Sequence, residues 1–484
     1  MNSLGAKALN GMAWSLAQGW FSRSIGLIVF ILLSRLLDTA DFGIVAMGLV
    51  FHRLSSAIPE SVVFQRTVQR PEAEENYLRT AFTGSLIYAL IILFGAWLSA
   101  DYIARVSGFP TLSNILPAIG FVAFLECLAC LPRAIVIRRM QYRDDALRRG
   151  TASALGGCLA VGFAYLGFGI WALVIHLIAQ AAVNLALIWH FSRWRVQLGI
   201  HKEVLPDLVN FGGYLILFRL LGMIRGQAPT FLIGLFWGAE TLGFFTIARR
   251  FFNAVNDSSF SAVNRVTLSI FSRASDFNKE VRDIFPTSLF ALSVFFISPM
   301  LALSLLSDVL VQLFFGKAWM PSGETLSFLL VAGAFGATSV FCSQVLLASG
   351  KPEVAVKIRM VLLPFVLTLF YSVGPISPDA IPISLIAVSV VTTCFLVTIC
   401  KLELKLSLAA LTPCISSFGI SIFCFLVARI TLIQLDLHGP VELTLLAASM
   451  MALSIFIHFV VVKQQLRLLA LRLSRNLKML FNSR

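Results

Sequence analysis

The chain has 484 residues, of which 58% are hydrophobic and only 13% are charged, and its mean hydropathy is +0.88. This composition excludes an ordinary soluble domain and predicts a multi-pass membrane protein. The net charge of +14 does not indicate nucleic-acid binding, because the basic residues are spread over short loops between apolar runs instead of gathering on one folded surface.

Fourteen apolar runs follow one another along the chain, each about 18 or more residues long and therefore long enough for a membrane-spanning helix. The first six cover about residues 13–37, 41–64, 80–100, 113–132, 150–168 and 170–191. The other eight cover about residues 210–236, 240–271, 286–306, 324–348, 356–374, 381–400, 408–432 and 442–462. No small-residue cleavage site follows the first run, so we expect it to stay in the membrane as a helix.

A polar segment from Arg193 to Val209 separates the first six runs from the next six. We therefore expect an N-terminal six-helix lobe over residues 1–200, a C-terminal six-helix lobe over 201–407, and an extra helix pair with a basic cytoplasmic tail over 408–484. The polar segment and the tail from Lys463 are each interpreted as an amphipathic helix on anionic lipids. For the tail, a solvated helix end is the alternative.

Arginine and lysine are concentrated in alternate loops, which predicts the orientation of the helices. Residues 133–149 contain six arginines, whereas residues 101–112 contain only Arg105 and residues 307–323 contain only Lys317. The sequence therefore predicts that residues 1–12, 133–149 and 463–484 are cytoplasmic and that 101–112 and 307–323 lie outside. Both termini are expected in the cytoplasm.

The two predicted lobes contain similar short segments. The sequence TADFG at residues 39–43 is similar to GAETLG at residues 238–243. The spacing of three and seven residues is also repeated, in Arg53, Ser56 and Glu60 and then in Arg250, Asn253 and Asp257. Aligning both features needs a gap of three residues. Internal repeats of this kind are typical of secondary transporters.

Several arginines fall inside apolar runs, where a guanidinium costs at least a few kcal/mol unless it faces water, a partner or a ligand. They are Arg23, Arg53, Arg219, Arg225, Arg249, Arg250 and Arg265. The acids in the same runs are fewer, namely Glu60, Glu126 and Asp257. We therefore expect these arginines to line a polar cavity that binds an anion. The alternatives are that they snorkel to the interface or only neutralise carboxylates.

No motif for soluble catalysis or nucleotide binding occurs in the sequence, which lacks HExxH, GxSxG and a phosphate-cradling glycine-rich loop. The Cys127-x-x-Cys130 pair has no second pair or histidine cluster nearby, as a structural zinc site would need. We expect no enzyme activity, no cofactor and no metal site. His52, beside Arg53, is interpreted as a packing or helix-end residue.

Three short motifs resemble those of bacterial polysaccharide flippases in the multidrug, oligosaccharidyl-lipid and polysaccharide exporter superfamily. Residues 34–43, SRLLDTADFG, resemble the family's Ala-Arg-x-Leu-Gly-x-x-Asp-Phe-Gly turn, with Asp38 where the family has glycine. Residues 315–319, FGKAW, resemble its Gly-x-x-Trp turn. Residues 346–352, LLASGKP, resemble its Ala-x-Gly-Lys/Arg-Pro helix end. The resemblance extends from about residue 10 to 400.

The resemblance implies two six-helix lobes around a central cavity. It also implies alternating access that moves an undecaprenyl-pyrophosphate-linked glycan across the bacterial inner membrane. In the related flippases of lipid-linked peptidoglycan precursors, arginines on the first, second and eighth helices line the cavity, and Arg23, Arg53 and Arg265 correspond to them by helix and depth. A lipid-linked oligosaccharide is then the substrate, and a polysaccharide polymerase and glycosyltransferases are candidate partners.

The arginines fit a pyrophosphate, because guanidinium groups bind phosphate oxygens through paired, charge-assisted hydrogen bonds. One alternative is an ion-coupled multidrug antiporter of the same superfamily, whose cavity should be governed by carboxylates. The other alternative, a membrane-embedded glycan polymerase, would need an acid or base in a sizeable outer loop. Without an ATP site, we expect the membrane potential, a proton or sodium to drive transport, with Glu60 and Asp257 releasing and rebinding arginines. Permanent salt bridges at these two acids are the alternative.

Overall fold

The computed structural model describes residues 24–70, 74–271, 285, 286, 288–348, 352–404, 408–434 and 439–461. Within some of its helices the side chains are not described, among them those of residues 258–271. Arg23, the N-terminal residues 1–12 and the tail from residue 463 therefore lie outside the described residues, and so does the side chain of Arg265.

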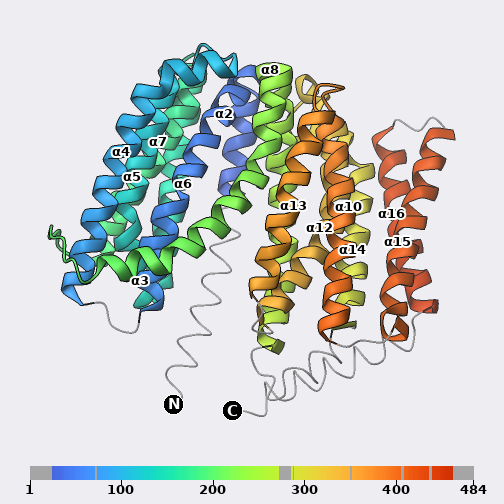
Figure 1. Ribbon diagram of the computed structural model, residues 1–484. Coiled ribbons are helices and arrows are strands. Elements are labelled where there is room, and N and C mark those ends of the chain that lie inside the picture. Colours follow the sequence, from blue (N-terminus) through green and yellow to red (C-terminus); the bar gives the residue numbers. More distant parts are fainter. Residues whose placement is uncertain are drawn as a thin grey trace. The chain divides into compact units, whose positions relative to one another are not determined.

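The described residues form helices without strands (Figure 1). The first helices are α2 (Thr39–Ser55), the π-helix η1 (Pro59–Gln65), α3 (Arg66–Gln69), α4 (Glu75–Ser107), α5 (Leu112–Arg138), α6 (Tyr142–Tyr165), α7 (Ile170–Ser192) and α8 (Leu205–Phe271). They are followed by η2 (Ser293–Ile297), α10 (Ser298–Leu305), α11 (Ser307–Phe314), η3 (Lys317–Trp319), α12 (Ser322–Ala348), α13 (Pro352–Val373), α14 (Ala380–Glu403), α15 (Leu408–Gln434) and α16 (Pro440–Val461).

Among the described residues, 7 helices are long and apolar enough to cross a membrane, or up to 8 if the bent pair Thr39–Ser55 and Pro59–Gln69 is one span. Shorter apolar helices cover Ser24–Ser34, Met360–Val373, Ser416–Leu432 and Val441–Ile457. The predicted all-helical, multi-pass class is therefore confirmed. The count of fourteen spans stays a prediction.

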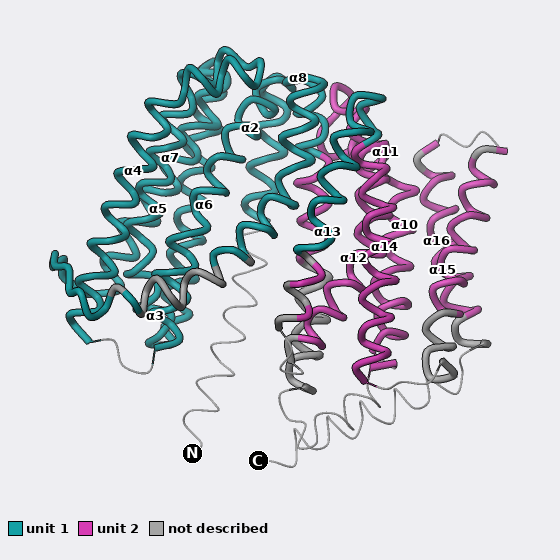
Figure 2. Tube along the Cα trace, in the orientation of Figure 1, with its two compact units in different colours: residues 1–247, 359–380 teal, residues 248–358, 381–484 magenta. Residues whose placement is uncertain are grey.

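The chain forms two compact units (Figure 2). Unit 1 contains residues 1–247 and 359–380, and unit 2 contains residues 248–358 and 381–484. Two of the three divisions between the units fall inside α8 and α13, so each of these helices contributes to both units, and the third lies at the start of α14. The lobe boundaries that we expect near residues 200 and 407 stay predictions.

In unit 1, α5 is the central helix. It packs against α2, α4 and α7. In an 18-residue apolar stretch of each helix, 67% of α5 is buried, against 28% of α4 and 22% of α7. The face of α4 that packs here is built from small residues, among them Ala89, Ala96 and Ala100, all at most 3% exposed. Small side chains let helix backbones approach closely, which is how helices associate within a membrane.

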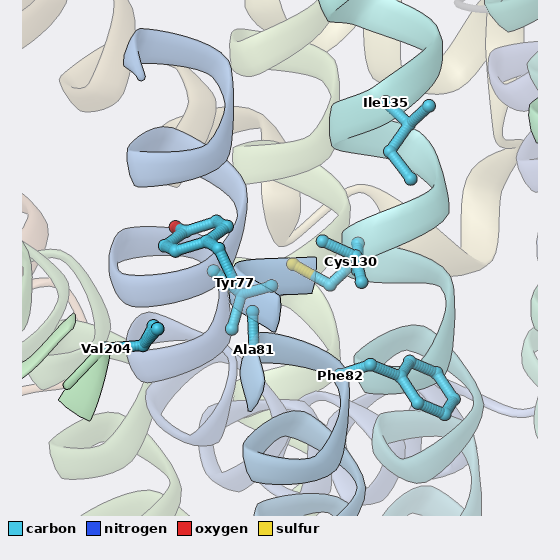
Figure 3. Close-up of a cluster of buried hydrophobic side chains, with 8 residues drawn as sticks. Tyr77, Ala81, Phe82, Cys130, Ile135 and Val204 are labelled. Atoms are coloured by element: carbon cyan, nitrogen blue, oxygen red, sulfur yellow. The ribbon is translucent and has the colours of Figure 1, made fainter. Parts of the chain in front are cut away.

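An apolar cluster lies where α4, α5 and the segment before α8 meet. Tyr77 and Phe82 extend from α4, Cys130 and Ile135 from α5, and Val204 from the segment before α8 (Figure 3). Tyr77 is fully buried, and its hydroxyl lies 3.4 Å from the hydroxyl of a buried threonine on α3. This cluster holds the start of α8 against α4 and α5.

Residues 193–201 are not helical, so the interpretation of this segment as an amphipathic helix is wrong. The backbone N–H groups of Gly199 and His201 donate to the hydroxyls of Thr83 and Thr80, at 3.0 Å each. The ring of Trp194 lies 5.2 Å from that of Phe82. Trp194 therefore packs on α4, the same helix that accepts hydrogen bonds from the segment's backbone.

Gly43 and Gly243 form a reciprocal contact between the start of α2 and the second part of α8. A Cβ atom at Gly43 would overlap the carbonyl oxygen of Ala239, and one at Gly243 would overlap that of Thr39. Just before this contact α8 breaks at Gly238, whose φ of 78° favours glycine. An exchange of equivalent contacts is what a two-fold relation between the predicted repeats would give.

In unit 2, three buried serines join the C-terminal helix pair to α10. The hydroxyl of Ser298 lies 2.8 Å from that of Ser421 on α15 and 3.0 Å from that of Ser454 on α16. All three residues are at most 1% exposed. Hydroxyl pairs of this kind satisfy polar groups between helices inside a membrane. The extra helix pair is therefore packed into unit 2.

Candidate functional site

The second predicted span is bent, and the bend shapes a polar site. The two parts of the span, Thr39–Ser55 and Pro59–Gln69, meet at 46°, and the second part begins with the π-helix η1. Pro59 explains the break, because proline lacks the N–H for the helical ladder and its ring clashes with the preceding turn. Single π-helical turns are frequent at functional sites.

Beside this bend, unit 1 contains a pocket of about 160 Å³, room for several water molecules. Its walls come from α2, η1, α5, α6 and α7. The polar residues that line it are His52, Ser55, Ser56, Glu60, Glu126, Arg133, Arg148 and Asn184. Three of these residues, His52, Glu60 and Glu126, fall inside the predicted apolar runs, where ionisable groups are costly and therefore indicate a functional site.

Glu60 lies between two arginines. Its carboxylate is 3.4 Å from Arg133 Nη1 and 3.8 Å from Arg219 Nη2. All three side chains are 24% to 30% exposed. Both distances exceed the roughly 2.7–2.9 Å of a strong charge-assisted hydrogen bond, so each pair is loose. The guanidinium of Arg133 is further held over the ring of Phe64, 4.5 Å from its centroid.

His52 lies against Glu126, with Nε2 3.3 Å from Oε2. The histidine is 14% exposed and the glutamate 49% exposed. The Nδ1 atom of His52 is buried and has no hydrogen-bond partner among the described residues. His52 lies in the last turn of α2, as predicted for a helix-end residue, and it is also a polar member of the pocket. The signal in the sequence was a histidine and a glutamate inside two apolar runs, 41–64 and 113–132, with a third run between them.

A buried ion pair closes the α6 side of the pocket. Arg148 Nη2 donates to Asp145 at 2.6 Å, and Arg148 Nη1 donates to the side-chain oxygen of Asn184 at 2.8 Å. Arg149 Nη2 lies 2.9 Å from the other oxygen of Asp145. Burial alone would raise the pKa of Asp145, but Arg148 and Arg149 hold it below its usual value. Asp145 and Arg148 were read from the sequence only as residues of a cytoplasmic loop.

The structure brings one pair of predicted site residues together, Glu60 and Arg219. Arg53, at the end of α2, is exposed and has no carboxylate within ion-pair distance among the described residues. Arg225 is half-buried on α8 in unit 1. The remaining described positions lie on the part of α8 in unit 2, and they are Arg249, half-buried, with Arg250 and Asp257, both exposed. Their roles stay predictions.

The family model described as "Polysaccharide biosynthesis protein" matches residues 32–324. The succinoglycan biosynthesis transport protein ExoT of Rhizobium meliloti (strain 1021) is 24% identical over 321 residues, 66% of this chain and 65% of that protein. The lipopolysaccharide biosynthesis protein WzxC of Escherichia coli (strain K12) is 21% identical over 363 residues, 74% of this chain and 73% of that protein.

Two solved structures show the same fold. The lipid II flippase MurJ in an inward closed conformation is similar with a TM-score of 0.74 and 14% identity, over 93% of this chain and 99% of that chain. An inward-facing multidrug resistance MATE transporter of the MOP superfamily has a TM-score of 0.57 and 14% identity, over 80% of this chain and 94% of that chain. At these identities the likeness concerns the fold alone.

Proposed function

The chain belongs to the polysaccharide biosynthesis protein family, and from this we propose that it is a flippase for a lipid-linked oligosaccharide. It moves an undecaprenyl-pyrophosphate-linked glycan across the bacterial inner membrane by alternating access, for polysaccharide biosynthesis. The observation that carries the proposal is the similarity, over 321 residues, to a protein named for transport in succinoglycan biosynthesis. The chain acts as a transporter and not as an enzyme.

The pyrophosphate is held by arginines inside the apolar helices. Arg53 is available for an anion, because it is exposed and no carboxylate among the described residues neutralises it. Arg219 is only loosely held, 3.8 Å from Glu60, so a phosphate group can displace that carboxylate. The full proposed set is Arg23, Arg53, Arg219, Arg225, Arg249, Arg250 and Arg265. The sugars occupy a hydrated cavity and the lipid tail stays in the bilayer.

Glu60 and Asp257 couple transport to an energy source. When the substrate phosphate binds the arginines, Glu60 loses partners, and it pairs with them again after release. Moving one charge through 100 mV supplies about 2.3 kcal/mol, so a membrane potential, a proton or sodium can drive the return of a cationic cavity. The termini lie in the cytoplasm, the basic tail contacts anionic lipids, and a polymerase and glycosyltransferases act beside the flippase.

An ion-coupled multidrug antiporter is the second candidate, and the unit 1 pocket argues against it. A cationic drug needs a free carboxylate, whereas both carboxylates that line this pocket already face a basic side chain, Glu60 at Arg133 and Glu126 at His52. A glycan polymerase is disfavoured because the outer loops predicted from the sequence are short.

Replacing the arginines tests the flippase proposal. In cells that depend on this protein for polysaccharide export, Arg23→Ala and Arg53→Ala should abolish export at normal protein levels. Arg53→Lys should restore it only in part, because an ammonium lacks the forked geometry of guanidinium. Arg195→Ala is the matched control, since Arg195 is exposed in the segment before α8 and away from the apolar runs.

Export and the amount of lipid-linked glycan accumulated in the membrane are the two measurements. Loss of export with accumulation of the lipid-linked glycan is the expected result. Normal export in both alanine variants would show that these arginines do not bind the substrate. Loss of export without accumulation would place the defect before flipping and contradict the proposed function.

A further inference from the structure

His52 and Glu126 form an acid–base pair inside apolar helices, a combination that is typical of proton relays in membrane proteins. Because Nε2 of His52 faces the carboxylate, we assign the ring hydrogen to Nε2, and Nδ1 then carries the free lone pair. Nδ1 is buried and has no partner among the described residues. A proton on Nδ1 would therefore have no acceptor in the described structure. Protonation of His52 thus favours a different arrangement of the side chains, in which Nδ1–H has an acceptor.

Water has access to this pair. Glu126 lines the pocket of about 160 Å³ and is 49% exposed, while His52 is mostly buried beside it. A proton carried by water in this pocket can thus reach the carboxylate side of the pair, next to the mostly buried imidazole.

The charged groups on every element around the pair define its electrostatic setting. On its own helix and the adjoining η1 these are Arg53 and Glu60, on α5 Arg133, on α6 Arg148 with Asp145 and Arg149, and on α8 Arg219. The α7 wall contributes the neutral Asn184. Arginines thus outnumber carboxylates around the pocket, which disfavours a further positive charge on His52 as long as no anion is bound.

A bound anion offsets this excess of positive charge. A pyrophosphate at Arg219 brings at least two negative charges and draws that arginine away from Glu60, 3.8 Å from it. The excess of arginines over carboxylates is then cancelled, which removes the electrostatic penalty against the imidazolium form of His52. Proton binding and anion binding should therefore promote each other, and by linkage the effect must be reciprocal.

We propose that His52 and Glu126 form a proton-binding site that takes up one proton from pocket water when an anionic lipid headgroup binds at Arg219. An O–H bond of a hydronium ion in the pocket breaks as the Nδ1–H bond of His52 forms, which leaves a neutral water molecule and an imidazolium. This proposal rests on the proposed function, because it needs a pyrophosphate-containing substrate. It assigns the proton to the His52–Glu126 pair, and it gives Glu60 the role of transmitting anion binding to that pair.

The test uses the full-length chain in lipid nanodiscs and undecaprenyl pyrophosphate as the probe. Calorimetric titrations at pH 7 in buffers of different ionisation enthalpy give both the dissociation constant and the number of protons taken up per bound probe. For the unmodified protein we expect net proton uptake and a dissociation constant that rises with pH, by up to about tenfold per pH unit. The sign follows because the bound state holds the extra proton.

Two variants and one control identify the group that takes up the proton. His52→Gln keeps a side-chain amide for Glu126 but cannot titrate, so it should bind the probe with less proton uptake and a weaker dependence on pH. Glu126→Gln should also reduce the uptake, because it removes the charge that stabilises the imidazolium. The control is His190→Gln, which alters an exposed histidine at the end of α7 and should leave the uptake unchanged.

The outcomes separate this inference from the proposed function. Binding with proton uptake that falls in His52→Gln but not in His190→Gln supports the proton site. Binding with equal proton uptake in His52→Gln and the unmodified protein overturns the site and leaves the flippase proposal in place. No binding by the unmodified protein at any pH between 6 and about 8 overturns the proposed function and this inference with it.

Discussion

Replacing Asp145 with asparagine should destabilise unit 1, because it leaves a buried arginine without its counter-charge. Asp145 and Arg148 are each 7% exposed in their side chains, and the carboxylate accepts from Arg148 at 2.6 Å and lies 2.9 Å from Arg149. After the substitution, Arg148 keeps its bond to Asn184 but loses the only negative charge within ion-pair distance among the described residues. Removing one partner of a buried ion pair typically costs about 3–5 kcal/mol.

The neighbouring acid provides a matched control. Asp144 is half-buried and has no ion pair among the described residues, so Asp144→Asn should change the free energy of unfolding by no more than about 0.5 kcal/mol. For a unit of this size about 1 kcal/mol corresponds to a shift of roughly 2 °C, so we expect Asp145→Asn to lower the melting temperature by about 6–10 °C. Thermal unfolding of the purified protein in detergent, followed by fluorescence-detected gel filtration, measures both shifts.

The same pair predicts a pH dependence. Arg148 and Arg149 hold the pKa of Asp145 below its usual value in the folded protein, so the pair stabilises the fold above the unfolded-state pKa of about 3.9. That contribution is lost as the pH falls through the lower, folded-state pKa. The difference between the unmodified protein and Asp145→Asn should therefore stay constant from about pH 8 to pH 5 and shrink in stronger acid. Equal melting temperatures for the two asparagine variants at pH 7 would refute the reasoning.

Three further predictions concern packing, orientation and coupling. Gly43→Ala should destabilise the protein by about 1–3 kcal/mol or more because its Cβ overlaps a carbonyl oxygen, whereas Gly84→Ala, with open space around it, should not; melting temperatures compare the two. A cysteine at Arg143 in a cysteine-free protein should react with a membrane-impermeant reagent only from the cytoplasmic side, and reaction from outside would invert the predicted topology. In proteoliposomes, Glu60→Gln and Asp257→Asn should weaken the dependence of transport on pH and potential, and an unchanged dependence would exclude both carboxylates from coupling.

Composition and periodicity were enough to predict the class of this protein. Long apolar runs place the helices, since a span needs a nearly unbroken stretch of apolar residues, and the predicted run at 113–132 lies within α5 at Leu112–Arg138. The turn motif at residues 34–43 also predicted the right family, and the family match over residues 32–324 includes it. Asp38 is compatible with that turn, since its φ of −74° and ψ of 154° are extended backbone that needs no glycine.

The sequence also predicted that intramembrane charges matter, but it could not predict their partners. The sequence related Glu60 to Arg53 only by a spacing of seven residues. In the structure a π-helix begins at Pro59, and Glu60 lies beside Arg133 and Arg219, which come from other helices. A period of 3.6 residues predicts neither the π-helical turn nor the helices that pack beside it.

Tertiary structure alone decided which distant residues share the pocket. His52 and Glu126 are 74 positions apart in the sequence and meet only because α2 packs on α5. The sequence assigned Asp145 and Arg148 to a cytoplasmic segment because residues 133–149 contain six arginines. In the structure Asn184 of α7 accepts a hydrogen bond from Arg148 and covers the pair. Charge pattern determines on which side of a membrane a segment lies, whereas burial and pairing depend on the helix that packs beside it, and no local sequence feature specifies that neighbour.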